Sequence, residues 1–313
     1  MSTLDDTPPQ DTVSGFYGWT DTLKGIYYVF LRNVTAHGAT FYGIGEHTPI
    51  AGIREGIRIF KENGCDVIVS VGGGSPIDGS KAILYSIQLE TGGATLKQIA
   101  IPTTLSAAEY SIGAGFTTDE GEKIAVSSQD LAPAGIILDG ELTLPTPERL
   151  WLSTGIRSLD HAVENLYRPG VSFPVKQLMY AALKDLFHYL PASKKDPTNV
   201  EYRQRLQLAS WMSLWPMKLQ KYSALGISHS LGHKLGARFS IPHGITSCLT
   251  LAPTVVMKAD VGSEDDKKEP STGSLEGDDL GLDTTLSAYK GALGTQNQNY
   301  EVERVVKLLE SIL

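Results

Sequence analysis

The sequence predicts an α/β domain with a parallel sheet, Rossmann-like but truncated, followed by an all-α domain. Apolar runs of strand length alternate with segments of helical period through the first half of the chain. Strand-like runs then stop, and the second half contains helical patterns alone. We therefore expect an α/β domain over residues 1–144 and a helical domain over residues 145–313.

Composition limits the class of protein. Of the 313 residues, 41% are hydrophobic and 20% charged, which suits one large or two medium folded domains. The net charge of −8 leaves no basic surplus for a nucleic-acid partner. No apolar run reaches the roughly 18 residues of a membrane helix, and the acidic, polar start is unlike a signal peptide. We expect a cytoplasmic protein whose two cysteines, Cys65 and Cys248, are reduced core thiols.

The elements of the first half follow in order. Residues 1–15 are polar, and we expect them to be disordered. Isoleucines recur at helical spacing over residues 50–61, and Asn63 and Gly64 stop this helix. Because the strand-like runs are apolar throughout, the sheet should be parallel and covered on both faces. Strands are expected over 25–31, 39–45, 65–71, 98–104, 115–118 and 134–140.

A glycine cluster, Gly72, Gly73 and Gly74 followed by Ser75, joins a strand to a helix. Without side chains the backbone can approach a diphosphate, and the amides at the helix start would point toward it. The alternative is that a tight turn alone selects glycine. Asp78 has a similar alternative, in which it only places negative charge in the first turn of the helix.

Hydroxyl side chains follow the next strand. Thr103, Thr104 and Ser106 come where the run 98–104 ends, and ligands of open α/β folds collect at this carboxyl edge of the sheet. A plain helix cap explains the same residues equally well.

Four segments of the second half have helical period. Residues 258–283 are charged and nearly free of large apolar side chains, so we expect a flexible loop there. The closing segment 299–313 is expected to form an amphipathic helix. The four helical segments cover 145–167, 176–190, 202–215 and 228–239.

Histidines gather in the second half. His229 and His233 are four residues apart on one helix face, His243 follows shortly after, and His161 lies in an earlier helix. Four imidazoles can ligate a divalent metal or move protons. Any one of them alone is better explained as a satisfied core histidine, whereas the set indicates function. His37, His47 and His188 have no such companions, and we expect them to be structural or exposed.

Four motifs together resemble the group III (iron-containing) alcohol dehydrogenases, closest to the maleylacetate reductase branch, whose fold is similar to dehydroquinate synthase. The resemblance runs from about His47 to Thr254, roughly two thirds of the chain. It implies a nucleotide-binding domain and a helical domain, with substrate and nicotinamide meeting in the cleft between them. The motifs are VGGGSPIDGSKAI at 71–83, IPTTLSAAEYS at 101–111, GIRSLDHAVENLY at 155–167 and HSLGHKLGARFSIPHGITSCL at 229–249.

The resemblance implies roles for the first-domain residues. The glycine cluster Gly72–Ser75 would hold the diphosphate of NAD or NADP, with Asp78 assisting. Thr103, Thr104 and Ser106 would line the nicotinamide side. Lys123, in the turn after the strand 115–118, matches a lysine that the family places near the cofactor.

The resemblance also implies a site for a divalent metal, iron or zinc, with one departure. His161, His229 and His243 match the family's three histidine ligands, and His233 matches a further histidine beside nicotinamide and substrate. The family's aspartate ligand is Arg157 in this chain. A guanidinium deletes one metal bond and adds a fixed positive charge, so metal binding should be impaired or lost.

Two interpretations of Arg157 remain open. Maleylacetate reductases also lack the aspartate and resemble this pattern as metal-independent enzymes. Arg157 would then clamp a substrate carboxylate and polarise the acceptor. Alternatively, Arg157 only pairs with Asp160 or Glu164. Asp160 lies about 100° around the helix from His161, so we do not expect it to replace the missing ligand.

The predicted function is an NAD(P)H-dependent reductase of a small carbonyl compound or unsaturated carboxylate. His233, or failing that His243, would deliver the proton, while His161 and His229 orient the substrate. Relatives are commonly dimers, so a homodimer is expected. The alternative is a repurposed lyase, cyclase or isomerase without dinucleotide, since no acidic residue for the adenosine ribose is recognisable before His47. The histidine cluster argues against a silent binding protein.

Overall fold

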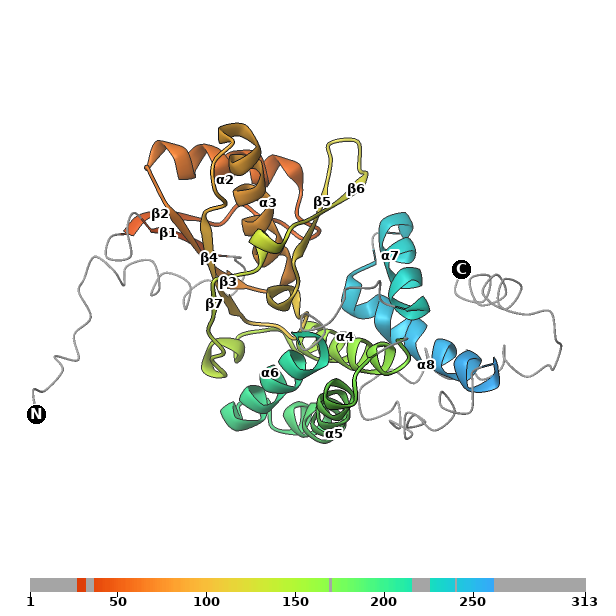
Figure 1. Ribbon diagram of the computed structural model, residues 1–313. Coiled ribbons are helices and arrows are strands. Elements are labelled where there is room, and N and C mark those ends of the chain that lie inside the picture. The colour runs from red at the N-terminus through yellow and green to blue at the C-terminus, as the bar shows by residue number, and fades with distance from the viewer. Residues whose placement is uncertain (1–26, 32–36, 169–170, 216–225, 240, 262–313) are drawn as a thin grey trace, which may run out of the picture. The chain divides into compact units, whose positions relative to one another are not determined.

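Figure 1 shows the computed structural model of the chain, which describes residues 27–31, 37–168, 171–215, 226–239 and 241–261. The chain divides into two compact units, Met1–Thr146 and Pro147–Leu313. The expected disorder of residues 1–15 and the expected helix over 299–313 lie outside the described residues.

The first unit is built on a five-stranded sheet of strand order β2-β1-β3-β4-β7. Strands β3, β4 and β7 are parallel, which confirms the predicted parallel sheet for this part. Strand β1 is antiparallel to both neighbours. For β2 the reason is the connection, since the five residues 32–36 are too few for a parallel crossover. The strands are β1 (Tyr27–Leu31), β2 (His37–Phe41), β3 (Val67–Gly72), β4 (Lys97–Pro102) and β7 (Gly135–Ile136).

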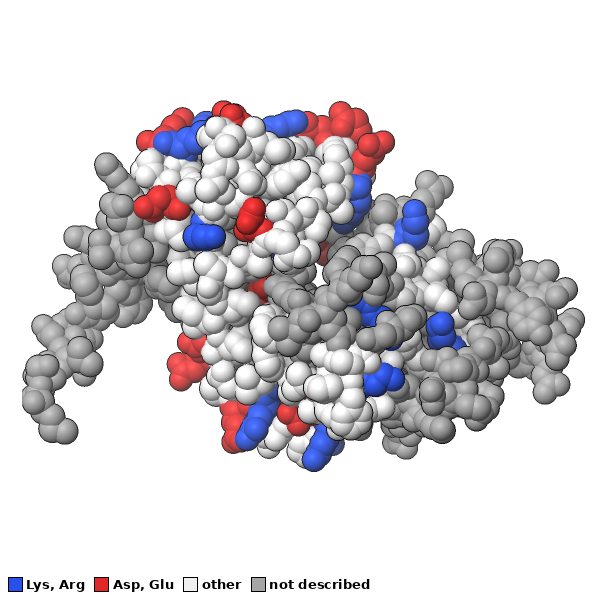
Figure 2. Space-filling view, viewed as in Figure 1, with Lys and Arg blue, Asp and Glu red and all other residues white. Residues whose placement is uncertain are grey.

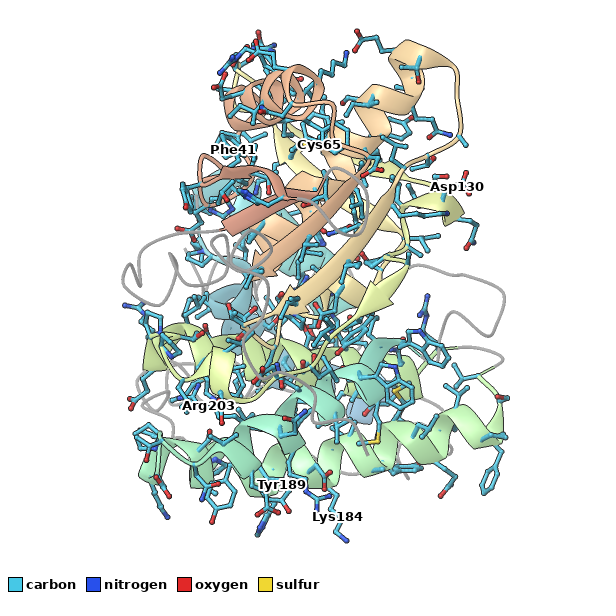
Figure 3. All side chains as sticks on the ribbon, turned by 90° about the vertical axis from the view of Figure 1, so that its left-hand side faces the viewer. Phe41, Cys65, Asp130, Lys184, Tyr189 and Arg203 are labelled. Carbon is cyan, nitrogen blue, oxygen red and sulfur yellow. The ribbon has the colours of Figure 1, made fainter. Side chains whose placement is uncertain are left out.

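Two helices, α2 (Ile50–Glu62) and α3 (Gly74–Thr91), pack on one face of this sheet (Figure 1). As predicted, Asn63 and Gly64 stop α2. Asn63 follows the last helical residue as its C-cap, and Gly64 takes a left-handed φ of 59°. Phe41 and Cys65, marked in Figure 3, belong to the apolar cluster between helices and sheet. The other face of the sheet carries Val69, Val71 and Ile101, with Leu142 packed against them. The rest of the first cluster is Ile44, Ile53, Phe60, Ile68, Ala82, Ile83, Leu84 and Ile87.

A hairpin and three short 3-10 helices complete the first unit. Strands β5 (Gly113–Thr117) and β6 (Lys123–Ser127) are antiparallel, and Lys123 opens β6 opposite Thr117 instead of lying in the turn. Strand β7 is shorter than predicted, because the Asp139 carboxylate accepts the backbone N–H of Glu141 and turns the chain. The short helices are η1 (Ala108–Tyr110), η2 (Gln129–Leu131) and η3 (Glu141–Thr143).

The described part of the second unit is all helical, as predicted. Helix α4 is buried along its length from Trp151 to Leu166 and contacts each of the other four helices. Gly155 permits the close crossing of α4 with Leu190 of α5, because a Cβ there would overlap the leucine side chain. The helices are α4 (Glu148–Leu166), α5 (Phe173–Lys195), α6 (Val200–Leu214), α7 (Ile227–Phe239) and α8 (His243–Val261).

One predicted boundary in this unit is wrong. Residues 258–261, expected to start a flexible loop, form the last turn of α8. The apolar spacing of α8 continues through Met257, so the helix runs on into the polar sequence by one turn. The rest of the expected loop, 262–283, lies outside the described residues.

The surface of the described residues mixes acidic and basic side chains. Figure 2 shows them interspersed on the face in view. On α2, for example, Arg58 pairs with both Glu55 and Glu62. None of the helices in the described part of the chain combines the length and apolar character that a membrane span requires.

Candidate functional site

The glycine cluster forms a side-chain-free turn between β3 and α3. Gly72 ends β3 with a φ of 145°, a conformation that side chains rarely tolerate. A Cβ on Gly73 would lie 3.0 Å from Cγ2 of Thr104, and one on Gly74 would lie 3.1 Å from Oγ of Ser106. The turn therefore leaves room for backbone alone, at the N-terminus of an 18-residue helix whose dipole favours an anion.

The hydroxyl-bearing loop after β4 lies directly against this turn. Gly72 pairs with Pro102 in the parallel ladder, and the Thr103 amide donates to the Gly72 carbonyl at 2.9 Å. The Thr104 hydroxyl, on a buried residue, donates to the Ser106 hydroxyl at 3.2 Å. The structure thus brings these residues together at the carboxyl edge of the sheet, where α/β folds bind their ligands.

Asp78 faces the interior of the first unit. Its Oδ2 accepts the Gly115 amide at 3.3 Å, and its Oδ1 lies 3.5 Å from Nζ of Lys81. These contacts tie α3 to β5. A role of Asp78 at a cofactor diphosphate stays a prediction.

Lys81 is a buried cation that the sequence reading did not single out. Its side chain is fully buried, and burial lowers the pKa of the ammonium group. Nζ donates to the carbonyls of Ala108, Ser111 and Gly113 at 2.6 to 3.0 Å and to the Ser111 hydroxyl at 2.9 Å. Lysine in a helix is normally solvated, so nothing in the local sequence indicated that these acceptors surround it.

His47, expected to be structural or exposed, lies beside the predicted cofactor residue Lys123. Nζ of Lys123 and Nδ1 of His47 are 3.0 Å apart. His47 and Thr48 both have left-handed φ, 64° and 53°, at a cost of about 1–3 kcal/mol each. The Thr48 hydroxyl donates to the Ser75 carbonyl at 3.3 Å, which connects this strained segment to the glycine turn.

The second unit brings the four predicted histidines into one row. The ring centroids of His161 and His229 are 5.4 Å apart, those of His229 and His233 4.7 Å, and those of His233 and His243 4.9 Å. His161 comes from α4, His229 and His233 from α7, and His243 begins α8. His161 is buried and His233 is exposed.

Arg157 enters this row from α4. Its buried guanidinium donates from Nη2 to Nε2 of His229 at 2.9 Å and from Nη1 to the Ser247 hydroxyl at 3.1 Å. Asp160 is its counter-ion at 4.0 Å and accepts the Ser247 hydroxyl at 2.7 Å. The structure therefore shows the pairing of Arg157 with Asp160, whereas its binding of a substrate carboxylate stays a prediction.

The electrostatics of the row favour neutral imidazoles at His161 and His229. Burial, reinforced by the positive charge of Arg157, holds the pKa of His161 and His229 well below the ordinary value. Burial also raises the pKa of Asp160, which the charge of Arg157 opposes. Neutral rings keep one N–H donor and one acceptor nitrogen each.

The donor atoms of the row bear on whether a metal ion could bind there. No group of three or more His, Cys, Asp or Glu side chains in the described ranges is arranged to hold one. Nε2 of His229, one of the two ring nitrogens that can bind a metal, accepts the Arg157 guanidinium instead. By the resemblance, Arg157 also stands where the family has its aspartate ligand.

Two protein-family models match the sequence of this chain. The model for "Iron-containing alcohol dehydrogenase" matches residues 22–140, and the model for the C-terminal part of the same family matches residues 151–281. Together they cover most of the chain and extend the resemblance beyond His47 and Thr254 on both sides.

Individual relatives share this family. Dehydrogenase FUM7 of Gibberella moniliformis is 32% identical over 252 residues, which are 67% of this chain and 58% of the relative. NAD-dependent methanol dehydrogenase of Bacillus methanolicus is 26% identical, with coverages of 80% and 68%. Maleylacetate reductase of a Rhizobium strain is 28% identical, with coverages of 67% and 56%. The chain thus matches little more than half the length of two of these relatives.

The fold has solved counterparts. The structure of a putative alcohol dehydrogenase from Ralstonia eutropha superposes with a TM-score of 0.72 at 24% identity, covering 87% of this chain and 80% of that one. With both family models matched in chain order, the chain belongs to the iron-containing alcohol dehydrogenase family.

Proposed function

We propose that the chain is an NAD(P)H-dependent reductase of a small carbonyl compound or unsaturated carboxylate that works without a metal ion. The observation that carries this proposal is the buried guanidinium of Arg157, hydrogen-bonded to His229 at 2.9 Å within the row of four histidines. A fixed cation at this position can stabilise negative charge that develops on a substrate.

The first unit supplies the cofactor residues of this proposal. Gly72, Gly73 and Gly74 carry no side chain, and a Cβ on Gly73 or Gly74 would crowd Thr104 or Ser106, so a diphosphate can meet the backbone and the α3 N-terminus. Thr103, Thr104 and Ser106 would line the nicotinamide side, and Lys123 with His47 would lie near the cofactor. The NAD-dependent relative supports a nicotinamide cofactor, which supplies hydride when bound.

The second unit supplies the acid and the positioning groups. His233, exposed in the row, would deliver a proton to the substrate, with His243 next to it as the substitute donor. His161 and His229, held neutral by burial, would orient substrate oxygens through hydrogen bonds. The maleylacetate reductase relatives support an unsaturated carboxylate as the substrate class.

Cofactor binding tests the proposal directly. NADH or NADPH should quench tryptophan fluorescence and raise the melting temperature of the purified chain. Gly73→Ala, which places a methyl group 3.0 Å from Thr104, should raise the dissociation constant at least tenfold, whereas Gly93→Ala on an exposed turn should not. Silence with both cofactors would favour the other class, a lyase, cyclase or isomerase that needs no dinucleotide.

Two further measurements address the chemistry. Elemental analysis should find no stoichiometric iron or zinc, and a chelator should leave turnover unchanged. Turnover should fall about 10²–10⁴-fold in His233→Ala and stay unchanged in His188→Ala, an exposed histidine on α5. Turnover that appears only after metal is added would contradict the metal-independent mechanism.

A further inference from the structure

One face of α4 contacts His229 in three places. Arg157, His161 and Glu164 are spaced i, i+4 and i+7, so they follow one another along the same side of the helix. Arg157 donates to the His229 ring at 2.9 Å, and the His161 ring is 5.4 Å from it between centroids. Glu164 accepts the backbone amide of His229 at 3.2 Å. The ring and the backbone of one histidine are therefore both fixed from α4.

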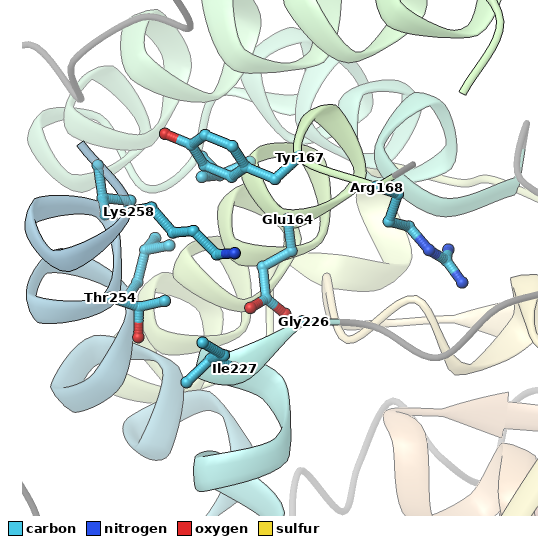
Figure 4. A pocket seen from close by; sticks show the side chains of 10 residues that line it. Glu164, Tyr167, Arg168, Gly226, Ile227, Thr254 and Lys258 are labelled. Atoms are coloured by element: carbon cyan, nitrogen blue, oxygen red, sulfur yellow. The ribbon is translucent and has the colours of Figure 1, made fainter. Parts of the chain in front are cut away.

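Glu164 acts as the N-cap of α7 from another helix. Its buried carboxylate accepts the amides of Ser228 at 2.7 Å and His229 at 3.2 Å, two donors of the first helical turn. The residue before α7 is Gly226, which has no side chain with which to cap the helix. A Cβ on Gly226 would lie 2.6 Å from Oε1 of Glu164. Figure 4 shows the Glu164 carboxylate at the start of α7, beside Gly226 and Ile227.

The contact with Arg157 decides which nitrogen of His229 carries the proton. A guanidinium has donors only, so Nε2 must accept, and the neutral ring then carries its hydrogen on Nδ1. This Nδ1 is buried and has no hydrogen-bond partner among the described residues. A buried N–H donor without a partner is costly, and an oxygen of a bound ligand would satisfy it.

We propose that Glu164 is a positioning residue for His229: by capping α7 it places the ring against Arg157, so that the Nδ1–H of His229 is presented to a substrate oxygen. The proposal rests on the proposed function for the identity of that substrate. The arrangement of Glu164, His229 and Arg157 is a separate claim, and it can be measured without turnover.

The test compares Glu164→Gln with Glu148→Gln, the same change at an exposed residue in the first turn of the same helix. Glutamine keeps one acceptor but sets an NH₂ group against one of the two backbone amides. Ring-¹⁵N histidine NMR, with His229 identified by its loss in His229→Ala, should show the Nδ1–H form in the parent and in Glu148→Gln. In Glu164→Gln this signal should shift toward a mixture of tautomers.

Kinetics provide the second readout. Glu164→Gln should lower kcat/KM for the carbonyl substrate roughly 10- to 100-fold, as a displaced catalytic group does, while the dissociation constant for NADH stays unchanged. If Glu164→Gln does not fold, Gly226→Ala disturbs the same cap with Glu164 intact and should give the same two changes.

The outcomes separate the two proposals. A lower melting temperature with an unchanged His229 spectrum and unchanged kcat/KM would overturn the positioning role and leave a cap that only stabilises the fold. A parent protein that neither binds a nicotinamide nor turns over would refute the proposed function, and the NMR comparison would still decide the role of Glu164.

Discussion

Replacing Arg157 with methionine would leave a buried carboxylate without its cation. Asp160 is fully buried, and the Arg157 guanidinium lies 4.0 Å from it. In the variant, hydroxyl donors such as that of Ser247 remain near Asp160, but the positive charge that lowers its pKa is removed. Removing one partner of a buried pair costs about 3–5 kcal/mol, so the melting temperature should fall by roughly 10 °C.

A double-mutant cycle isolates the interaction free energy between Arg157 and Asp160. Thermal unfolding would be measured for the parent, Arg157→Met, Asp160→Asn and the double variant, with Arg149→Met as the exposed control on the same helix. The double variant should be more stable than Arg157→Met, because it contains no uncompensated charge. Two results would contradict this: a free energy of unfolding for Arg157→Met within about 1 kcal/mol of the parent, or a double variant no more stable than Arg157→Met.

The change in stability of Arg157→Met with pH is an independent test of the same charge effect. Burial raises the pKa of Asp160 above its ordinary value, and the charge of Arg157 opposes this. A carboxyl whose folded pKa is raised loses stability as pH rises from its unfolded pKa through its folded pKa. Without Arg157 that window extends upward, so Arg157→Met should be less destabilised at pH 5 than at pH 8.

Two further predictions concern the first unit. Lys81→Met should destabilise the protein by about 3–5 kcal/mol in urea unfolding, because it removes the buried ammonium group that donates to Ala108, Ser111 and Gly113 and pairs with Asp78. Lys97→Met, at an exposed strand residue, should change little, and equal effects would contradict the argument. Burial raises the pKa of Glu109 to about 7 from 4.5, so stability should fall by roughly 3 kcal/mol as pH rises through that window. The fall in melting temperature from pH 5 to pH 8 should be smaller in Glu109→Gln than in the parent, and equal falls would contradict the argument.

Local sequence patterns were sufficient to predict those elements whose structure depends on a single segment of the chain. The β-branched run before Gly72 and the glycine cluster after it specify strand, turn and helix together. The isoleucine spacing of 50–61 and the stop at Asn63 specify α2 in the same way. The i, i+4 spacing of His229 and His233 places both imidazoles on one face before any fold is known.

Other features depend on segments that meet only in the folded chain. The apolar run of β1 contains no information about strand direction, so its antiparallel pairing could not be read from it. Lys81 is buried because carbonyls from 108–113 surround it, and Glu164 caps a helix that begins 63 residues later in the chain. His47 stands alone in the sequence and meets Lys123 only because the β5–β6 hairpin returns to it.

The charge balance around Arg157 bears on which family chemistry this chain can support. A divalent metal offers a substrate oxygen a net positive centre, whereas Arg157 is matched by a buried carboxylate 4.0 Å away and presents the field of an ion pair. The field of an ion pair is weaker and decays faster with distance than that of a lone cation, so it stabilises a localised alkoxide less. An acceptor that disperses its own negative charge depends less on that stabilisation. We therefore expect hydride acceptors whose negative charge delocalises onto a conjugated carboxylate to react faster than simple aldehydes. This expectation aligns the chain with its maleylacetate reductase relatives more closely than with the methanol dehydrogenase relative.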